Sequence, residues 1–292
     1  MIPMKKVAVI GLGIMGGSIA KALKKSNKYY VVGYNKPEEI NDKALKDGAV
    51  DEIWDGTTPL DTDITLLAVN PRVTFELLET LPSLLKKGSI LTDICGVKGE
   101  VVSLGEEVCK RAGIRFVGGH PMAGRERSGY DYSTEDLFFN RSYILTETQN
   151  TDKEAINELS QMALDIGCAG VTITSPAHHD KMIAYTSQIP HILAGAYMNS
   201  PTSATHNGYS AGSYHDVSRV ASVDENLWTQ LFLANKENLL YEIDILIRNL
   251  QDYKDAVACM DGSRLSGIIK TGRILKERDI IINGDEKPHK FG

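Results

Sequence analysis

The chain of 292 residues is poor in cysteine, and the few cysteines it has are not spaced like metal ligands or redox pairs. They are Cys95, Cys109, Cys168 and Cys259, and no two of them form a CxxC motif. A disulfide scaffold needs a higher density of cysteine, and a zinc site needs clustered ligands. The cysteines therefore predict separate thiols in a reducing compartment and no metal site.

Long hydrophobic runs and an excess of positive charge are also missing. No apolar run approaches the roughly 20 residues that span a bilayer, and the N-terminal residues lack the apolar stretch of a signal peptide. The formal net charge is -6, which argues against nucleic acid or an anionic membrane as a partner. We therefore expect a cytoplasmic protein that binds a small molecule, with local positive charge in the site if that molecule is an anion.

Up to residue 174, apolar strands alternate with helical patterns. This alternation is typical of a doubly wound, mostly parallel sheet, whose ligand lies beyond the carboxyl ends of the strands. We expect an α/β fold with a Rossmann-type dinucleotide-binding domain over residues 1–174. The expected strands are 7–10, 30–34, 64–69, 89–93, 114–118, 142–146 and 170–174, and helices are expected at 18–23 and 42–48.

From residue 175 the pattern changes to helix. Ser175-Pro176 supplies a helix cap followed by proline in the first turn, and no convincing strand follows. We predict an all-helical second domain over residues 175–292. Residues 182–215 contain no Asp, Glu, Lys or Arg, so we expect this stretch to be enclosed, either as a polar pocket or at a subunit interface.

A helical seam follows in the C-terminal part, where apolar residues recur at alternating intervals of four and three residues. Such a seam packs against another helix, either within the domain or across a dimer, and the periodicity does not separate the two. Its members are Leu239, Ile243, Leu246, Leu250, Tyr253 and Val257.

The N-terminal glycine turn is the first motif that carries chemistry. It follows an apolar strand and opens a helix, so its glycines allow a tight turn and the close approach of a dinucleotide pyrophosphate. The alternative is a glycine turn that binds nothing. We expect cofactor contacts from this turn and from the end of the third strand: Gly11, Leu12, Gly13, Ile14, Met15, Gly16, Val69 and Asn70.

The choice between NAD and NADP depends on the end of the second strand. An acidic residue usually binds the adenosine ribose there, but this chain has Asn35-Lys36. Asn35 can hydrogen-bond a ribose hydroxyl, and Lys36 either meets a 2′-phosphate or is a solvated surface charge. We expect NAD as the cofactor, with NADP not excluded.

The most informative stretch is residues 118–124, Gly-Gly-His-Pro-Met-Ala-Gly. It places His120 in a glycine-rich loop after a strand, and Pro121 biases the backbone of His120 towards an extended geometry. A fixed imidazole near a hydride acceptor suits alcohol oxidation, because one group must take the hydroxyl proton. We predict that His120 is the general base.

Four further positions are candidates near that base. Asp93 follows a strand and is expected near the cofactor. Lys98 supports an anion or the loop itself, or is only a lysine at the start of a helix. His179 and Asp180 adjoin on a helix, which favours a local polar network over a metal site.

Two residues frame the uncharged stretch. His191 is either a pocket donor or a capped core histidine. Arg219 either clamps a substrate carboxylate or forms an internal ion pair with Asp216 or Asp224.

Together these blocks resemble the prephenate/arogenate dehydrogenase family of tyrosine biosynthesis. The resemblance is carried by the glycine turn and by 93–98, 119–124, 128–129, 137–138, 179–180, 187–191, 216–221 and Trp228. It implies a Rossmann domain and a helical domain that dimerises, with the site in the cleft between them. It further implies oxidation of prephenate with loss of carbon dioxide, His120 as base, and His191 and Arg219 as catalytic-site ligands of the substrate carboxylates.

The chain also departs from the family pattern. Gly96 stands where a serine often contacts the substrate, Gln188 replaces a common histidine, and His215 replaces a common arginine. We expect these three residues and His179 to lie at the substrate site, and the substrate is either prephenate or arogenate.

Two other classes remain open. A β-hydroxyacid dehydrogenase or imine reductase has the same domain plan, and Lys236 can imitate the lysine that some of these enzymes use. A dinucleotide-sensing protein on the same fold predicts cofactor binding without turnover.

Overall fold

The structure is a computed structural model that describes residues 4–124 and 127–283 of the chain. It forms two compact units, Met1–Leu239 and Leu240–Gly292. The domain boundary expected after residue 174 lies inside the first unit and stays a prediction.

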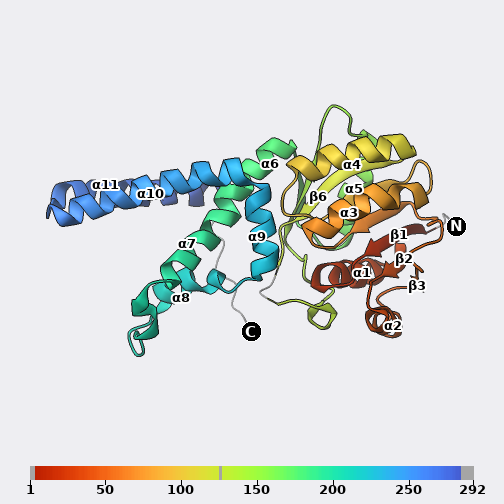
Figure 1. The fold of residues 1–292 in the computed structure, drawn as a ribbon, viewed down its shortest axis with the longest axis horizontal. Helices are drawn as coiled ribbons and strands as arrows, with labels where there is room; N and C mark the ends of the chain where they lie inside the picture. The colour runs from red at the N-terminus through yellow and green to blue at the C-terminus, as the bar shows by residue number, and fades with distance from the viewer. Residues whose placement is uncertain (1–3, 125–126, 284–292) are drawn as a thin grey trace. The chain divides into compact units, whose positions relative to one another are not determined.

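An eight-stranded sheet organises the first unit, in the order β3-β2-β1-β4-β5-β6-β7-β8 (Figure 1). Neighbouring strands are parallel except β6 and β7, which are antiparallel. The order turns back between β1 and β4, which is the point where doubly wound sheets bind their ligands. The strands are β1 (Lys5–Ile10), β2 (Tyr29–Tyr34), β3 (Glu52–Ile53), β4 (Ile64–Leu67), β5 (Ile90–Asp93), β6 (Arg115–Pro121), β7 (Ser142–Thr146) and β8 (Gly170–Thr174).

Helices cover both faces of this sheet. They are α1 (Ile14–Ser26), α2 (Glu38–Lys46), α3 (Pro71–Thr80), α4 (Gly99–Ala112) and α5 (Lys153–Asp165), with short 3₁₀ turns at Leu81–Leu84 and Tyr130–Tyr132.

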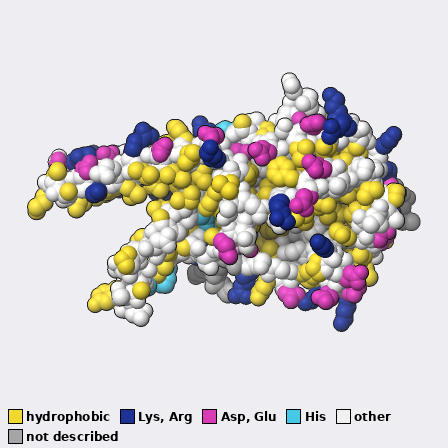
Figure 2. All heavy atoms as spheres, viewed as in Figure 1, with side chains coloured by type: hydrophobic (Ala, Val, Ile, Leu, Met, Phe, Trp, Pro, Cys, Tyr) yellow, Lys and Arg dark blue, Asp and Glu magenta, His cyan; other side chains and the backbone are white. Residues whose placement is uncertain are grey.

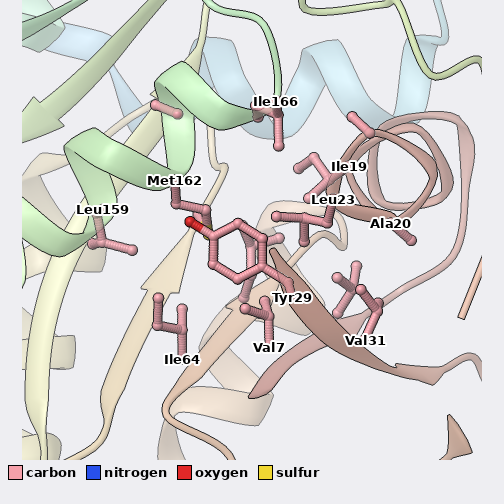
Figure 3. Packing of buried hydrophobic residues seen from close by; sticks show 14 of the residues in the cluster. Val7, Ile19, Ala20, Leu23, Tyr29, Val31, Ile64, Leu159, Met162 and Ile166 are labelled. Atoms are coloured by element: carbon pink, nitrogen blue, oxygen red, sulfur yellow. The ribbon is translucent and has the colours of Figure 1, made fainter. Parts of the chain in front are cut away.

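Alternate residues of β1 enter two separate cores, because side chains of a strand point to opposite faces. Val7 belongs to the cluster that includes Ile19 of α1 and Met162 of α5, which Figure 3 shows around the ring of Tyr29. Ala8 belongs to the other cluster, with residues of α3 and α4. The predicted doubly wound α/β domain is thereby confirmed.

The position of His120 differs from the expectation. His120 was expected in a loop, but β6 continues to Pro121 and the imidazole projects from a strand. The reason is a long-range pairing: β7 runs antiparallel to the end of β6, with His120 opposite Ile144. The glycines around His120 gave no local sign of that partner strand.

The rest of the chain is helical, as predicted, and no strand follows β8 in the described residues. The Ser175 hydroxyl accepts a hydrogen bond from His178 N at 3.2 Å and caps the first helix. The elements are α6 (Pro176–Ile183), a π-helical turn (Ala184–Gln188), α7 (Ile189–Met198), a 3₁₀ turn (Pro201–Ala204), α8 (Gly212–Ser218), a 3₁₀ turn (Arg219–Ala221), α9 (Glu225–Ala234), α10 (Lys236–Ala258) and α11 (Gly262–Asn283).

The uncharged stretch 182–215 is not enclosed within the chain. Tyr185 is 63% exposed and Tyr209 is 89% exposed, although Gln188 and Ala194 are buried. Of the two expected explanations, this exposure favours a surface that meets another subunit.

The seam on α10 is also largely uncovered. Leu250 is 52% exposed and Val257 is 60% exposed, and no described residue of α11 is buried. Figure 2 shows hydrophobic side chains gathered along these helices, whose ends are joined by the Arg264–Asp252 ion pair at 3.1 Å. Apolar surface of this extent typically marks an interaction site, which favours the dimer reading of the seam. None of the helices within residues 4–124 and 127–283 combines the length and apolar character needed to cross a membrane.

Candidate active site

The candidate site follows the carboxyl edge of the parallel strands. The glycine turn leaves β1 there, Val69 and Asn70 follow β4, and His120 lies at the end of β6. Three strand spacings of roughly 4.8 Å separate β1 from β6, so the glycine turn and His120 are about 14 Å apart along this edge. A dinucleotide bound at the turn can extend along the edge towards the imidazole.

The glycine turn is shaped for a close anionic ligand. A Cβ on Gly16 would lie 1.8 Å from the carbonyl oxygen of Gly11, so only glycine fits there. Gly13 is the N-cap of α1 with no side-chain cap, and a Cβ on it would meet nothing within 4 Å. The N-terminus of α1 is therefore open, and its N–H groups fit a dinucleotide pyrophosphate.

Asn35 supports that turn from the end of β2. Its Oδ1 accepts a hydrogen bond from Leu12 N at 2.9 Å, and Asn41 bonds to its backbone on both sides. Lys36 is exposed next to it. The predicted contact of Asn35 and Lys36 with the ribose stays a prediction.

Val69 and Asn70 lie on the other side of the turn. A Cβ on Gly11 would be 2.6 Å from Cγ1 of Val69, so Val69 packs directly against the turn. The Asn70 Oδ1 accepts from Val73 N at 3.0 Å and caps α3. The structure therefore brings the predicted cofactor residues of β1, β2 and β4 together.

His120 belongs to a hydrogen-bonded chain with His179 and Asp180. Nδ1 of His120 lies 2.9 Å from Nε2 of His179, and Nδ1 of His179 lies 2.7 Å from Oδ1 of Asp180. An ionised carboxylate only accepts, so His179 donates from Nδ1 and its Nε2 accepts from Nδ1–H of His120. Neutral His120 therefore keeps its lone pair on Nε2, the nitrogen a base needs.

Asp180 is held in place by the start of α4. Its Oδ1 accepts from Lys98 N at 2.7 Å, and its Oδ2 accepts from Gly99 N at 2.8 Å. The positive end of the α4 dipole stabilises the carboxylate. The predicted polar network of His179 and Asp180 is present, and its anchor on α4 was not anticipated.

Lys98 and Asp93 form a wholly buried ion pair, with Nζ of Lys98 2.5 Å from Oδ2 of Asp93. Asp93 also accepts from Cys95 N at 2.7 Å and from Gly119 N at 3.3 Å. The pair thus ties the loop after β5 to the strand residue before His120. Of the roles expected for Lys98, the structure shows the support of the loop. Asp93 is fully buried and engaged internally, and its predicted cofactor contact stays a prediction.

The surroundings of His120 favour its neutral form. Burial, the adjacent His179 ring and the Lys98 ammonium all lower the pKa of His120 well below the usual 6.5. Such a group is unprotonated at neutral pH, which is the form that a general base requires.

Gly96 lies near His120, and its predicted place at the substrate site stays a prediction. A Cβ on Gly96 would be 3.9 Å from Cε1 of His120 and 3.2 Å from Cδ2 of Leu231. Leu231, on α9, thus fills the space beside a position that has no side chain. Burial raises the pKa of the neighbouring Cys95 thiol to about 11, so this thiol stays protonated.

Gln188 and His179 are turned inwards. Gln188 is 1% exposed, and its Nε2 donates to Leu231 O at 3.0 Å. His179 is 1% exposed, with both ring nitrogens engaged as described. Direct substrate contact by these two residues stays a prediction. His179 bonds to His120, and Gln188 bonds to the backbone of Leu231.

A second group carries the predicted carboxylate ligands. Nδ1 of His191 donates to Val220 O at 2.7 Å, and the His191 ring lies 3.8 Å from the Trp228 ring. Arg219 precedes Val220 and is exposed, so His191 and Arg219 come from adjoining elements. Nδ1 of His191 is thus engaged within the chain. His215 is exposed on α8, and its ring lies against the Tyr214 ring.

Leu231 and Asn235 were not identified from the sequence. Asn235 is buried and donates from Nδ2 to Asp180 O and to Gln188 Oε1, both at 2.8 Å. The one local signal for Asn235 is its position between two helical patterns. No group of three His, Cys, Asp or Glu side chains suited to a metal is found within residues 4–124 and 127–283.

The doubly wound sheet, the open glycine turn and a neutral, half-buried histidine define the class of dinucleotide-dependent oxidoreductases. Two family models match the chain: "Prephenate dehydrogenase, nucleotide-binding domain" over residues 19–172 and "Prephenate dehydrogenase, dimerization domain" over residues 175–271. The chain belongs to the prephenate dehydrogenase family.

Individual relatives agree with this assignment. The chain is 31% identical to a prephenate dehydrogenase of Lactococcus lactis, over 94% of this chain and 77% of the relative. It is 33% identical to a cyclohexadienyl dehydrogenase of Zymomonas mobilis, over 89% and 91%. A crystal structure of prephenate dehydrogenase from A. aeolicus, in complex with hydroxyphenyl propionate and NAD⁺, superposes with a TM-score of 0.84 at 30% identity, covering 95% of this chain and 99% of that one.

Proposed function

We propose that this protein is a prephenate dehydrogenase that converts prephenate to 4-hydroxyphenylpyruvate and carbon dioxide with NAD as the hydride acceptor. The observation that carries the proposal is the hydrogen-bonded chain His120–His179–Asp180, which leaves Nε2 of a neutral His120 as the base. It stands on the same sheet edge as the open glycine turn. Membership of the family and the relatives named above support the choice of substrate.

NAD supplies the hydride acceptor when bound. The residues that would hold it are Gly11 to Gly16, with Val69 and Asn70 beside them. Their fit rests on the open N-terminus of α1 at Gly13, where an added Cβ would meet no atom.

His120 handles the proton of the ring hydroxyl. As the hydroxyl carbon loses its hydrogen as hydride, the hydroxyl proton passes to Nε2 of His120, and Nδ1 stays bonded to His179. The resulting dienone loses its ring carboxylate as carbon dioxide, and the electron pair of the broken bond makes the ring aromatic. The former hydroxyl oxygen then takes the proton back from His120, so the base is regenerated.

Arg219 and His191 bind the substrate carboxylates in this proposal. A guanidinium can form two parallel hydrogen bonds with a carboxylate, and an acidic protein needs such a local positive charge. The bond from His191 to Val220 O couples the imidazole to the residue after Arg219. Gly96 and His215 complete the proposed substrate surroundings.

The assembly we propose is a homodimer, supported by the dimerisation-domain match and by the exposed apolar residues of α10 and α11. Three buried unpaired thiols, Cys95, Cys109 and Cys168, support a reducing, cytoplasmic compartment.

Arogenate is the second candidate substrate, because the chain is as similar to a cyclohexadienyl dehydrogenase as to a prephenate dehydrogenase. The test is the formation of reduced nicotinamide by the purified protein, with prephenate or arogenate crossed with NAD or NADP. Turnover in any combination establishes the reaction, and the fastest combination gives substrate and cofactor. Cofactor binding with no turnover in all four would instead support a sensor.

The β-hydroxyacid dehydrogenase alternative has its own control. Lys236 is exposed and lies 3.6 Å from Glu237. Activity that survives Lys236→Ala and is lost in His120→Ala supports the histidine mechanism. The reverse result would overturn it.

A further inference from the structure

We propose that Asn235 is a positioning residue for His120, acting through a buried amide clamp formed by Asn235 and Gln188. The inference rests on the proposed function only in taking His120 as the base. The observation behind it is a set of buried hydrogen bonds that joins the α9–α10 junction to the helix that carries His179 and Asp180.

The clamp is fully bonded. Nδ2 of Asn235 donates to Asp180 O and to Gln188 Oε1, both at 2.8 Å. Nε2 of Gln188 donates to Leu231 O at 3.0 Å, and Oδ1 of Asn235 accepts from Asn238 Nδ2 at 2.9 Å. Asn235 is 4% exposed and Gln188 is 1% exposed. Buried polar groups satisfied this completely hold one arrangement, because losing a partner leaves the other unpaired.

Two backbone carbonyls decide how both amides point. Asp180 O and Leu231 O can only accept, so the Nδ2 of Asn235 and the Nε2 of Gln188 must face them. Oε1 of Gln188 then meets the second N–H of Asn235. An aspartate at residue 235 would present an oxygen to two acceptors, and a leucine would leave both unpaired.

The clamp holds Asp180, the last residue of the hydrogen-bonded relay His120–His179–Asp180. Asp180 follows His179 directly, and its carbonyl is bound by Asn235 while its carboxylate is bound by the start of α4. Gln188 closes the π-helical turn between α6 and α7, where the helix carries an extra residue. Such turns are common at functional sites and need partners that fix them. Asn235 thus fixes both ends of the segment from Asp180 to Gln188.

The same clamp holds an apolar side chain near His120. Through Gln188 it binds the carbonyl of Leu231, and a Cβ on Gly96 would lie 3.2 Å from Cδ2 of Leu231 and 3.9 Å from Cε1 of His120. Burial is the largest cause of the low pKa of His120. Loosening the clamp should admit water, raise that pKa and misplace Nε2 together.

The test compares Asn235→Leu with Asn238→Leu, which removes a carboxamide from α10 and leaves both Nδ2 bonds of Asn235 intact. Asn238 is only half-buried, so water can replace its bond to Oδ1 of Asn235. For Asn235→Leu we expect kcat to fall about 10- to 100-fold, because misplacing a catalytic group by about 1 Å costs that much. KM should change little, and the acidic limb of kcat/KM should move to higher pH. Asn238→Leu should leave the pH limb in place.

A second readout does not depend on turnover. NMR titration of the His120 imidazole in the protein without substrate should show a higher pKa in Asn235→Leu than in the wild type. If the wild type fails to oxidise prephenate, this titration still decides the positioning role, so failure of the two proposals is distinguishable.

Asn235→Asp provides the variant of unchanged size should Asn235→Leu not fold. Its carboxylate repels both acceptors at neutral pH, and its protonated form regains one donor, so kcat relative to wild type should recover as the pH falls. The inference is overturned if either variant loses activity or stability with the pKa of His120 and the acidic limb unmoved. It is also overturned if both variants behave as Asn238→Leu does.

Discussion

Nδ1 of His120 lies 2.9 Å from Nε2 of His179, and this one contact decides which nitrogen of His120 keeps its lone pair. The direction of the bond is set one residue further on, because the Asp180 carboxylate accepts the other N–H of His179 at 2.7 Å. The backbone N–H groups of Lys98 and Gly99, at the start of α4, in turn hold that carboxylate in place. The orientation of the two imidazoles is therefore set by backbone groups of α4 that lie behind His179.

Replacing Asp180 by asparagine should disturb that pattern without changing shape. One of the three donors that meet Asp180, from Lys98, Gly99 and His179, would then face an amide N–H. We expect kcat to fall about 10²- to 10⁴-fold in Asp180→Asn, as for loss of the correct tautomer of a catalytic histidine. Steady-state kinetics measure this, and the exposed His178→Asn serves as control. Equal kcat in the two variants would contradict the relay.

The pH dependence follows from the low pKa of His120. Activity requires the neutral imidazole, so kcat/KM should hold through pH 6.5 and fall only well below it. Stability should respond with the same sign. Below pH 6.5 the unfolded chain binds a proton that the folded chain refuses, so the free energy of unfolding should fall as the pH drops from 6.5 towards the folded pKa.

Steady-state kinetics over a range of pH check the predicted kcat/KM. Urea unfolding at several pH values checks the predicted free energy of unfolding. An acidic limb centred at 6.5 or above would show that His120 is solvated in the working enzyme.

The sequence was a good guide where structure is local. The glycine turn, the strands around it and the Ser175 cap all depend on neighbours a few residues apart, and each is found as predicted. The pairing of His179 with Asp180 was predicted for the same reason, since the two residues are adjacent.

What the sequence did not reveal depends on partners far along the chain. His120 was assigned to a loop because its partner strand β7 begins more than twenty residues later. Asn235 bonds to Asp180 across 55 residues, and Asp180 to Lys98 across 82. Such contacts have no period or local motif, so the clamp and the anchor of the relay become visible only when the chain is folded.

Two glycines near His120 should respond differently to alanine. A Cβ on Gly96 would meet the flexible tip of Leu231 at 3.2 Å, whereas one on Gly119 would meet the carbonyl oxygen of Asp93 at 2.7 Å. A side-chain tip can move and a paired backbone cannot. We expect Gly96→Ala to cost about 1 kcal/mol or less in free energy of unfolding, and Gly119→Ala about 2–3 kcal/mol.

Urea unfolding of the two variants gives the comparison. Adding Leu231→Ala to Gly96→Ala should relieve the contact at residue 96. Equal losses at the two glycines would contradict the packing described beside His120.

Substrate binding by Arg219 predicts an effect on KM. Arg219→Ala should raise KM for prephenate about 10- to 100-fold, which corresponds to about 1.4–2.8 kcal/mol for a hydrogen bond between charged groups. Arg219→Lys keeps the charge and loses the two-pronged geometry, so its KM should lie in between. Initial-rate kinetics measure both, with the exposed Arg248→Ala as control. An unchanged KM in Arg219→Ala would support a structural ion pair instead.

The last prediction concerns the exposed seam of α10. Leu250 is 52% exposed in the single chain, and a homodimer would cover such a residue. Leu250→Asp would then bury an unpaired carboxylate at the interface, which costs several kcal/mol and should shift the protein from dimer to monomer. Size-exclusion chromatography with light scattering measures the mass directly. Gln251→Asp places the same charge on the neighbouring exposed residue and should leave the dimer intact. If Leu250→Asp keeps the wild-type mass, the seam is not the dimer interface, because an aspartate in a packed apolar contact would not be tolerated without loss of association.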